Sequence, residues 1–145
     1  EFTPTKFDWR IGILDGRPFY ACRYYMAKDH WQIYNWNSKN EDDICGLFDC
    51  VPLDEVPHGI IKAALRVASL IGNGLYGVDL KEVNGKPMVI EVNDNPSIDD
   101  NIEDQIGGEK VYLTIMHSLR RRIEERMNSA QQRLLQHHGI DSYIL

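Results

Sequence analysis

Residues 77–99, GVDLKEVNGKPMVIEVNDNPSID, contain two β-strand patterns joined by Asn84-Gly85, and acidic residues interrupt the apolar positions of both strands. Side chains alternate between the two faces of a strand, so the length of the connecting loop decides which residues of a hairpin share a face. A two-residue Asn-Gly turn, the common choice for this dipeptide, would put Asp79 and Glu91 on opposite faces. It would also divide the apolar residues between the faces.

A three-residue loop, with Gly85 in a left-handed bulge conformation, gives a more coherent arrangement. The apolar residues then share one face, and they are Tyr76, Val78, Leu80, Met88, Ile90 and Val92. The polar residues share the other face, and they are Asp79, Lys81, Glu91 and Asn93. The apolar pattern therefore predicts the three-residue loop, which also brings the two carboxylates together.

Two carboxylates on one face of a hairpin repel each other unless a cation lies between them. With the Asn93 amide beside them, the available ligands are all oxygens, which suit Mg²⁺ or Mn²⁺. The alternative is a solvated acidic face that Lys81 balances. The residues alone leave both interpretations open.

The rest of the chain predicts a further hairpin, a short strand and two helices. The pair Asp15-Gly16 between β-prone runs is a strong hairpin signal, and apolar residues spaced three to four apart indicate helices. The expected elements are strands at 10–14 and 17–26, a short strand within 44–51, and helices at 56–71 and 109–136, with long loops at 28–43 and 94–108. This order predicts an α+β fold in which an antiparallel sheet of two β-hairpins packs against helices.

The composition limits the class of protein. The chain has 145 residues, of which 43% are hydrophobic, so it fits one globular domain. Its net charge of -6 argues against nucleic-acid and membrane partners, because both need a positive surface. Cys22, Cys45 and Cys50 form no CxxC pair, which favours reduced thiols in a cytoplasmic protein. No signal peptide is visible, and the first residue is not Met, which suggests a fragment or a processed chain.

The segments GVDL and VIEVNDNPS together resemble the C-terminal part of ATP-grasp ligases, particularly the RimK-like branch that includes a ribosomal-protein glutamate ligase. The similarity lies in the order and spacing of Asp79, then Glu91-x-Asn93, then a short turn that contains Pro96. The upstream motif DWR, which ends at Arg10, resembles the Asp-x-Arg motif of the same family.

The resemblance runs over about residues 3–104 and implies a division of the chain. Residues 1–128 would form the C-terminal lobe of an ATP-grasp domain, whose N-terminal lobe is absent, and 129–145 would form a helix end and tail. The family clamps ATP between its two lobes. We therefore expect this chain alone to bind ATP poorly and to show no ligase turnover.

The resemblance also implies roles for individual residues. Asp79, Glu91 and Asn93 would bind two Mg²⁺ or Mn²⁺ ions that bridge the phosphates of ATP, and Arg10 would be catalytic. Arg10 would face the phosphates, an acyl-phosphate intermediate or a substrate carboxylate. The implied reaction activates a carboxylate with ATP and lets the amine of an amino acid or peptide attack, which gives an amide, ADP and phosphate.

Two lysines are candidate cofactor-binding residues, Lys81 and Lys28. After the first hairpin, relatives often carry a basic, Gly-containing segment, whereas this chain has QIYNWNSKNEDDICG at residues 32–46, so the resemblance implies no phosphate or substrate contacts there. A rival interpretation is a nucleotide- or metal-binding module that has lost catalysis and acts through partners, with the long C-terminal helix as its docking element. The presence of all three expected ligands favours the enzyme.

Overall fold

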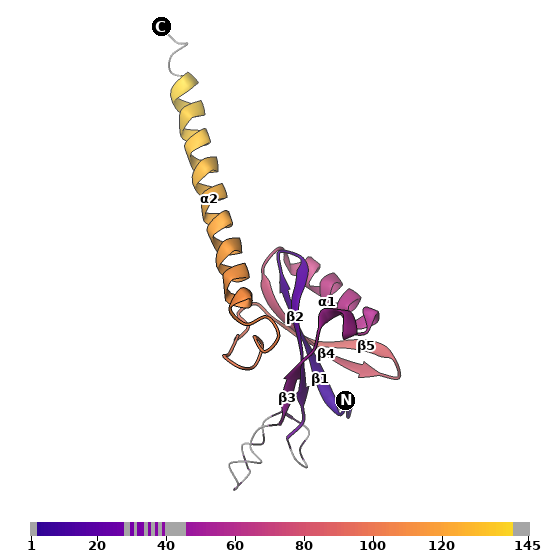
Figure 1. Ribbon diagram of the computed structural model, residues 1–145. Helices are drawn as coiled ribbons and strands as arrows, with labels where there is room; N and C mark the ends of the chain where they lie inside the picture. Colours follow the sequence, from indigo (N-terminus) through magenta and orange to yellow (C-terminus); the bar gives the residue numbers. More distant parts are fainter. Residues whose placement is uncertain are drawn as a thin grey trace. The chain divides into compact units, whose positions relative to one another are not determined.

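The structure is a computed structural model that describes residues 3–27, 30, 32, 33, 35, 37, 39 and 46–140. The chain divides into two compact units, one that ends at Val111 and one that begins at Tyr112. The first unit holds a sheet and a helix, and the second consists of most of one long helix (Figure 1). Lys28, Cys45 and most of the expected loop at 28–43 lie outside the described residues.

The sheet has five antiparallel strands in the order β3-β2-β1-β4-β5. Their bounds are β1 Phe7–Leu14, β2 Arg17–Tyr25, β3 Phe48–Cys50, β4 Leu75–Val83 and β5 Lys86–Asn93. The two hairpins, β1–β2 and β4–β5, meet because β1 pairs with β4. The predicted α+β fold with an antiparallel sheet of two hairpins is therefore confirmed, and β3 adds an edge strand shorter than expected.

The first hairpin turns at Asp15-Gly16, as predicted. Leu14 pairs with Arg17, so the loop has two residues. Asp15 and Gly16 have φ angles of 52° and 72°, which a two-residue type I′ turn requires.

The second hairpin corrects the predicted loop. Val83 pairs with Lys86, and Asn84 and Gly85 have φ angles of 52° and 71°, so the turn has two residues and not three. The ladder then shifts between Leu80, which pairs with Val89, and Asp79, which pairs with Glu91.

The extra residue in this β-bulge is Ile90, and it changes the faces that follow it. Beyond the bulge, Asp79 lies opposite Glu91, and the two side chains share a face as predicted. Met88 instead pairs with Lys81 on the polar face. Met88 and Ile90 are 44% and 49% exposed, so their predicted place in the apolar layer is wrong.

The other face of the sheet forms the core with α1, His58–Ile71 (Figure 1). The buried strand residues of this core are Trp9, Ile11, Ile13, Ala21, Tyr76, Val78 and Leu80. Helix α1 packs against them with Ile60, Ala64 and Ala68, which follow each other at four-residue spacing. Helix α1 begins at His58, two residues later than expected, and Pro57 and Gly72 occupy its N-cap and C-cap positions.

A disulfide joins Cys22 to Cys50, contrary to the expected reduced thiols. The disulfide depends on tertiary structure, because β2 pairs with β3 in a register that puts Cys22 directly opposite Cys50. The backbone N–H of Cys50 also donates a hydrogen bond of 3.1 Å to Gln105 Oε1, which ties β3 to the acidic loop at 94–108.

Helix α2 spans Glu109–Ile140 and confirms the long C-terminal helix, four residues longer than expected. Ion pairs between Arg120 and Glu124 and between Arg121 and Glu125 run along it. Several apolar side chains of this helix are exposed, and they include Met116, Leu119, Ile123 and Met127. Among the described residues, no helix is both long and apolar enough to cross a membrane.

Candidate functional site

The sheet gathers the predicted site residues on the face opposite α1. Arg10 on β1 pairs with Asp79 on β4, and Asp79 pairs with Glu91 on β5. Asn93 pairs with Gly77, two positions along the same ladder. Residues that are directly opposite in antiparallel strands point to the same side. The register therefore brings Arg10, Asp79, Glu91 and Asn93 onto one face.

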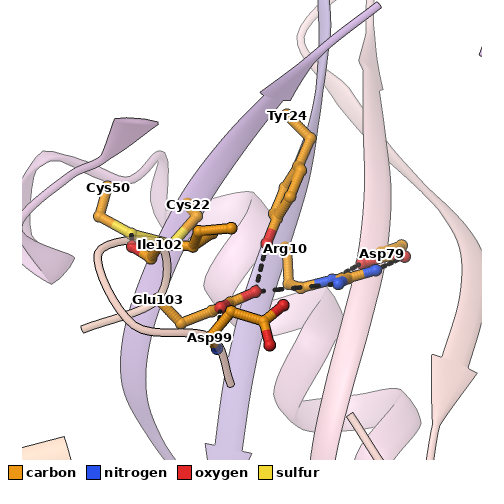
Figure 2. A network of polar contacts seen from close by, with 8 residues as sticks. All are labelled: Arg10, Cys22, Tyr24, Cys50, Asp79, Asp99, Ile102 and Glu103. Carbon is orange, nitrogen blue, oxygen red and sulfur yellow. Dashed lines mark hydrogen bonds and ion pairs between the residues drawn. A yellow bond between two sulfur atoms is a disulfide. The ribbon is translucent and has the colours of Figure 1, made fainter. Parts of the chain in front are cut away.

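Arg10 and Asp79 form a bidentate ion pair. Arg10 Nε and Nη2 each donate a hydrogen bond of 2.8 Å, to Oδ1 and Oδ2 of Asp79 (Figure 2). The two side chains are only 17% and 16% exposed. The hydrogen bonds to Asp79 raise the pKa of Arg10 above its usual value despite the opposing effect of burial, so the guanidinium stays charged.

Two further residues surround the guanidinium, and the sequence did not indicate either. The ring of Tyr24 lies 4.8 Å from Arg10 Cζ, a cation–π distance. Glu103 Oε1 lies 4.0 Å from Arg10 Nη1, the nitrogen that Asp79 does not contact. Figure 2 shows the Arg10 side chain between Glu103 and Asp79.

Glu103 is a buried carboxylate, only 1% exposed, in the acidic loop. Its Oε1 accepts a hydrogen bond from the Tyr24 hydroxyl, and its Oε2 accepts one of 2.8 Å from the Asp99 backbone N–H. Burial first and the Glu103 hydrogen bond second raise the pKa of Tyr24 well above 10, so its hydroxyl remains a donor. The hydrogen bond between Tyr24 and Glu103 thus holds the acidic loop against the polar face of the sheet.

Tyr20, also on β2, belongs to the same surroundings. Its hydroxyl is buried and has no hydrogen-bond partner in the part of the chain that the structure describes. Burial first and the charge of Glu103 second raise the pKa of Tyr20 well above 10. This hydroxyl is an unsatisfied polar group beside a charged network.

Lys81 lies on the predicted face but is already engaged. Its ammonium donates to Asp8 Oδ1 at 2.6 Å and to Thr5 Oγ1 at 2.9 Å, and the residue is 8% exposed. The structure therefore places Lys81 in an ion pair at the edge of the site. The other predicted lysine, Lys28, is outside the described residues.

The glycine at position 77 makes room for this arrangement. A Cβ atom there would lie 2.9 Å from Pro96 Cβ and 4.0 Å from Arg10 Cδ. Contacts below 3 Å between carbon atoms are strongly repulsive, so a side chain would displace the loop that contains Pro96. Gly77 thus lets the NPS turn, Asn95-Pro96-Ser97, lie directly on β4.

The oxygen donors fit a hard cation. Glu91 is exposed and forms no hydrogen bond or ion pair with any residue that the structure describes. Asn93 Oδ1 accepts one hydrogen bond, of 2.9 Å from the Asn95 backbone N–H. Each oxygen of Asp79 accepts one bond from Arg10. Carboxylate and amide oxygens accept more than one bond, so these donors retain free lone pairs.

Two carboxylates and an amide are also the donor types that Mg²⁺ and Mn²⁺ prefer. Within the described ranges, no group of three or more His, Cys, Asp or Glu side chains is arranged to hold a metal ion. The fit accordingly depends on Asn93 as the third donor.

The α+β fold of the chain is similar to the fold of solved ATP-grasp ligases. The solved structures that it resembles include D-alanine–D-alanine ligase from Bacillus anthracis, with a TM-score of 0.61 and 22% identity over 85% of this chain. A structure of such a ligase from Bacillus anthracis complexed with ATP gives a TM-score of 0.58 at 22% identity, again over 85% of this chain.

The chain covers 42% and 43% of those two ligases, so it spans less than half of their length. No protein-family model matches the chain, and no curated protein matches it. The resemblance to the ATP-grasp fold is thus confirmed, and the RimK-like subtype stays a prediction.

Proposed function

We propose that the chain is the C-terminal part of an ATP-dependent carboxylate–amine ligase, which forms an amide through an acyl phosphate. The observation that carries this proposal is the Arg10–Asp79–Glu91 register, with Asn93 two positions farther along, on one face of an ATP-grasp fold. Such a face presents both acidic metal ligands and a cation to a polyphosphate. In this proposal, residues 1–128 form the C-terminal lobe of an ATP-grasp domain, and residues 129–145 form its helix end and tail.

In this proposal each residue acts through its charge or its position. Asp79, Glu91 and Asn93 hold two divalent ions, which neutralise the phosphates of ATP when they are bound. Arg10 faces the transferred phosphoryl group or the activated carboxylate and stabilises its negative charge. The chain itself needs no nucleophile, because the substrate carboxylate and amine supply the reacting atoms.

Exposed apolar residues beside the metal ligands support a nucleotide site. Met88 shares the polar face with Lys81, and Ile90 precedes Glu91 in the bulge. Both are about half exposed, although they belong to a strand. An apolar surface next to oxygen ligands suits a purine whose phosphates bind the metal, so we assign this surface to the adenine of ATP.

The RimK-like assignment rests on sequence alone. It implies that the substrate is an amino acid or a peptide. The supporting residues are the DWR motif with Arg10 and the continuous run of Glu91, Asn93 and the NPS turn. Glutamate is the first acceptor or donor to test.

The direct test uses the natural protein that contains these 145 residues. We would incubate it with ATP, Mg²⁺, glutamate and hydroxylamine, because hydroxylamine traps an acyl phosphate as a hydroxamate. We expect ADP and hydroxamate in equal amounts, and at least about a 100-fold lower rate in Glu91→Gln. Asp94→Asn, which removes an exposed neighbouring charge, should retain the rate. ADP release without hydroxamate for any amino acid would count against a ligase.

One observation favours a second candidate function, a binding module without catalysis. Helix α2 exposes Met116, Leu119, Ile123 and Met127 along its length, which is unusual for a solvated helix. Docking to a partner through α2 would be the main function if the natural protein bound Mg²⁺ and ATP but neither hydrolysed ATP nor formed hydroxamate.

A further inference from the structure

Arg10 and Asp79, to which the proposed function assigns different tasks, bind each other in this structure. Asp79 is a proposed metal ligand, yet both of its oxygens accept hydrogen bonds from Arg10. Arg10 is the proposed cation for an anionic substrate group, yet Asp79 neutralises it. A divalent ion beside Asp79 would repel the guanidinium, so metal and arginine compete for the same carboxylate.

Glu103 offers the guanidinium a second acceptor. It lies 4.0 Å from Nη1 and is fixed by the Tyr24 hydroxyl and by the Asp99 backbone N–H. The Tyr24 ring, at 4.8 Å, can support the guanidinium in either position. Figure 2 shows these groups on the side of Arg10 that faces away from Asp79.

The charges of the cluster agree with an exchange. Arg10 contributes one positive charge, and Asp79, Glu91 and Glu103 contribute three negative charges, which leaves a net charge of -2. This equals the charge that the first of the two proposed divalent ions neutralises. Glu103 is needed for the balance, although it is too deeply buried to touch the metal itself.

We propose that a divalent cation at Asp79, Glu91 and Asn93 displaces Arg10 from Asp79, and that Glu103 then holds the guanidinium beside Tyr24. Glu103 is thus a positioning residue, because it holds Arg10 at the site once Asp79 binds the metal. The inference rests on the proposed function, because that function assigns the metal to Asp79. It adds that metal binding and the release of Arg10 are one coupled event.

The test measures Mn²⁺ affinity of this chain by electron paramagnetic resonance of the free ion. Arg10→Gln removes the competitor for Asp79 and should bind Mn²⁺ at least about fivefold more tightly. Glu103→Gln removes the second acceptor and should bind at least about fivefold more weakly. If Glu103 acts through Arg10, the Glu103→Gln effect should disappear in the Arg10→Gln background.

A matched control separates exchange from general electrostatics. Arg23 and Asp49 form another bidentate pair on β2 and β3. Arg23→Gln makes the same charge change away from the site and should alter Mn²⁺ affinity less than about twofold. Equal effects of Glu103→Gln in both backgrounds would show simple electrostatics and overturn the inference.

Other outcomes distinguish this inference from the proposed function. Unchanged Mn²⁺ affinity in Arg10→Gln would overturn the exchange and leave the metal site in place. If neither the unmodified chain nor Arg10→Gln binds Mn²⁺, the metal site fails and the exchange fails with it.

Because Glu103 is buried, Glu103→Gln is vulnerable to misfolding, so a second measurement uses the unmodified chain. In a Mg²⁺ titration followed by NMR, the Arg10 Nε–Hε resonance should move with the same midpoint as the Glu91 amide. A Glu91 shift with an unmoved Arg10 resonance would contradict the proposal.

Discussion

Asp79 lies directly opposite Glu91 in the β4–β5 ladder because β5 contains one extra residue, Ile90, that β4 does not match. Without this bulge, the two-residue turn at Asn84-Gly85 would put the two carboxylates on opposite faces. The bulge therefore brings the two carboxylates onto one face, as a three-residue loop would, but it lies five residues after Gly85 and not in the turn. β-bulges commonly redirect side chains next to functional sites.

The turn itself gives a stability prediction. Gly85 has a φ of 71°, so Gly85→Ala should lower the free energy of unfolding by about 1 to 2 kcal/mol. Gly59 is exposed in the first turn of α1, where alanine fits the backbone, so Gly59→Ala should raise it by about 0.5 kcal/mol. Urea unfolding of both variants measures the difference. Equal effects would contradict the assigned turn.

The exposed position of Glu91 gives a prediction about metal binding. Because Glu91 has no partner among the described residues, Glu91→Gln should change stability by less than about 0.5 kcal/mol. It should weaken Mn²⁺ binding at least about tenfold, since it removes a charged ligand. Asp94→Asn removes a neighbouring exposed charge and should change the affinity less than about twofold. Calorimetric titration of the three proteins decides whether Glu91 is a ligand.

Local patterns predicted most of the fold. The Asp15-Gly16 turn, the apolar spacing in α1 and the long run of α2 all depend on residues close in sequence. The shared face of Asp79 and Glu91 was also predicted correctly, but for the wrong reason. The bulge at Ile90 has no sequence signature of its own, so the apolar pattern favours a three-residue loop instead.

The parts that the sequence did not predict depend on long-range contacts. Tyr24 and Glu103 are 79 residues apart, and neither belongs to a recognisable motif. Alternation along β2 could have put Tyr24 on the face of Arg10, but only the loop over the sheet brings Glu103 there. The Cys22–Cys50 disulfide also depends on a long-range contact, because it follows from the register of β2 and β3.

The two bidentate Arg–Asp pairs differ in burial, which gives a matched comparison. Asp79→Asn leaves Arg10 partly buried without a carboxylate partner and should lower the free energy of unfolding by about 2 kcal/mol. Asp49→Asn breaks the more exposed pair with Arg23 and should lower it by less than about 1 kcal/mol. Chemical denaturation at one ionic strength tests the order, and the reverse order would show that burial does not govern these pairs.

The raised pKa values of Tyr20 and Tyr24 predict a loss of stability in alkali. Folding favours the neutral phenol, so this contribution is complete below the ordinary pKa near 10 and is lost as the pH rises above it. With tyrosines labelled at ¹³Cζ, both resonances should keep their protonated positions above pH 10 while the chain is folded. In urea they should titrate near pH 10. Ionisation of either residue near pH 10 in the folded chain would contradict the network.

Tyr24 and Tyr20 allow the same atom to be removed from two different environments on one strand. Tyr24→Phe deletes the donor to buried Glu103 and should lower the free energy of unfolding by about 2 kcal/mol, because the carboxylate loses a partner that water cannot replace. Tyr20→Phe deletes a buried hydroxyl without a partner among the described residues, so it should be neutral or stabilise by up to about 1 kcal/mol. Urea unfolding at pH 7 compares them. Equal losses would mean that the Tyr20 hydroxyl has a partner of its own, such as a bound water, within the polar network.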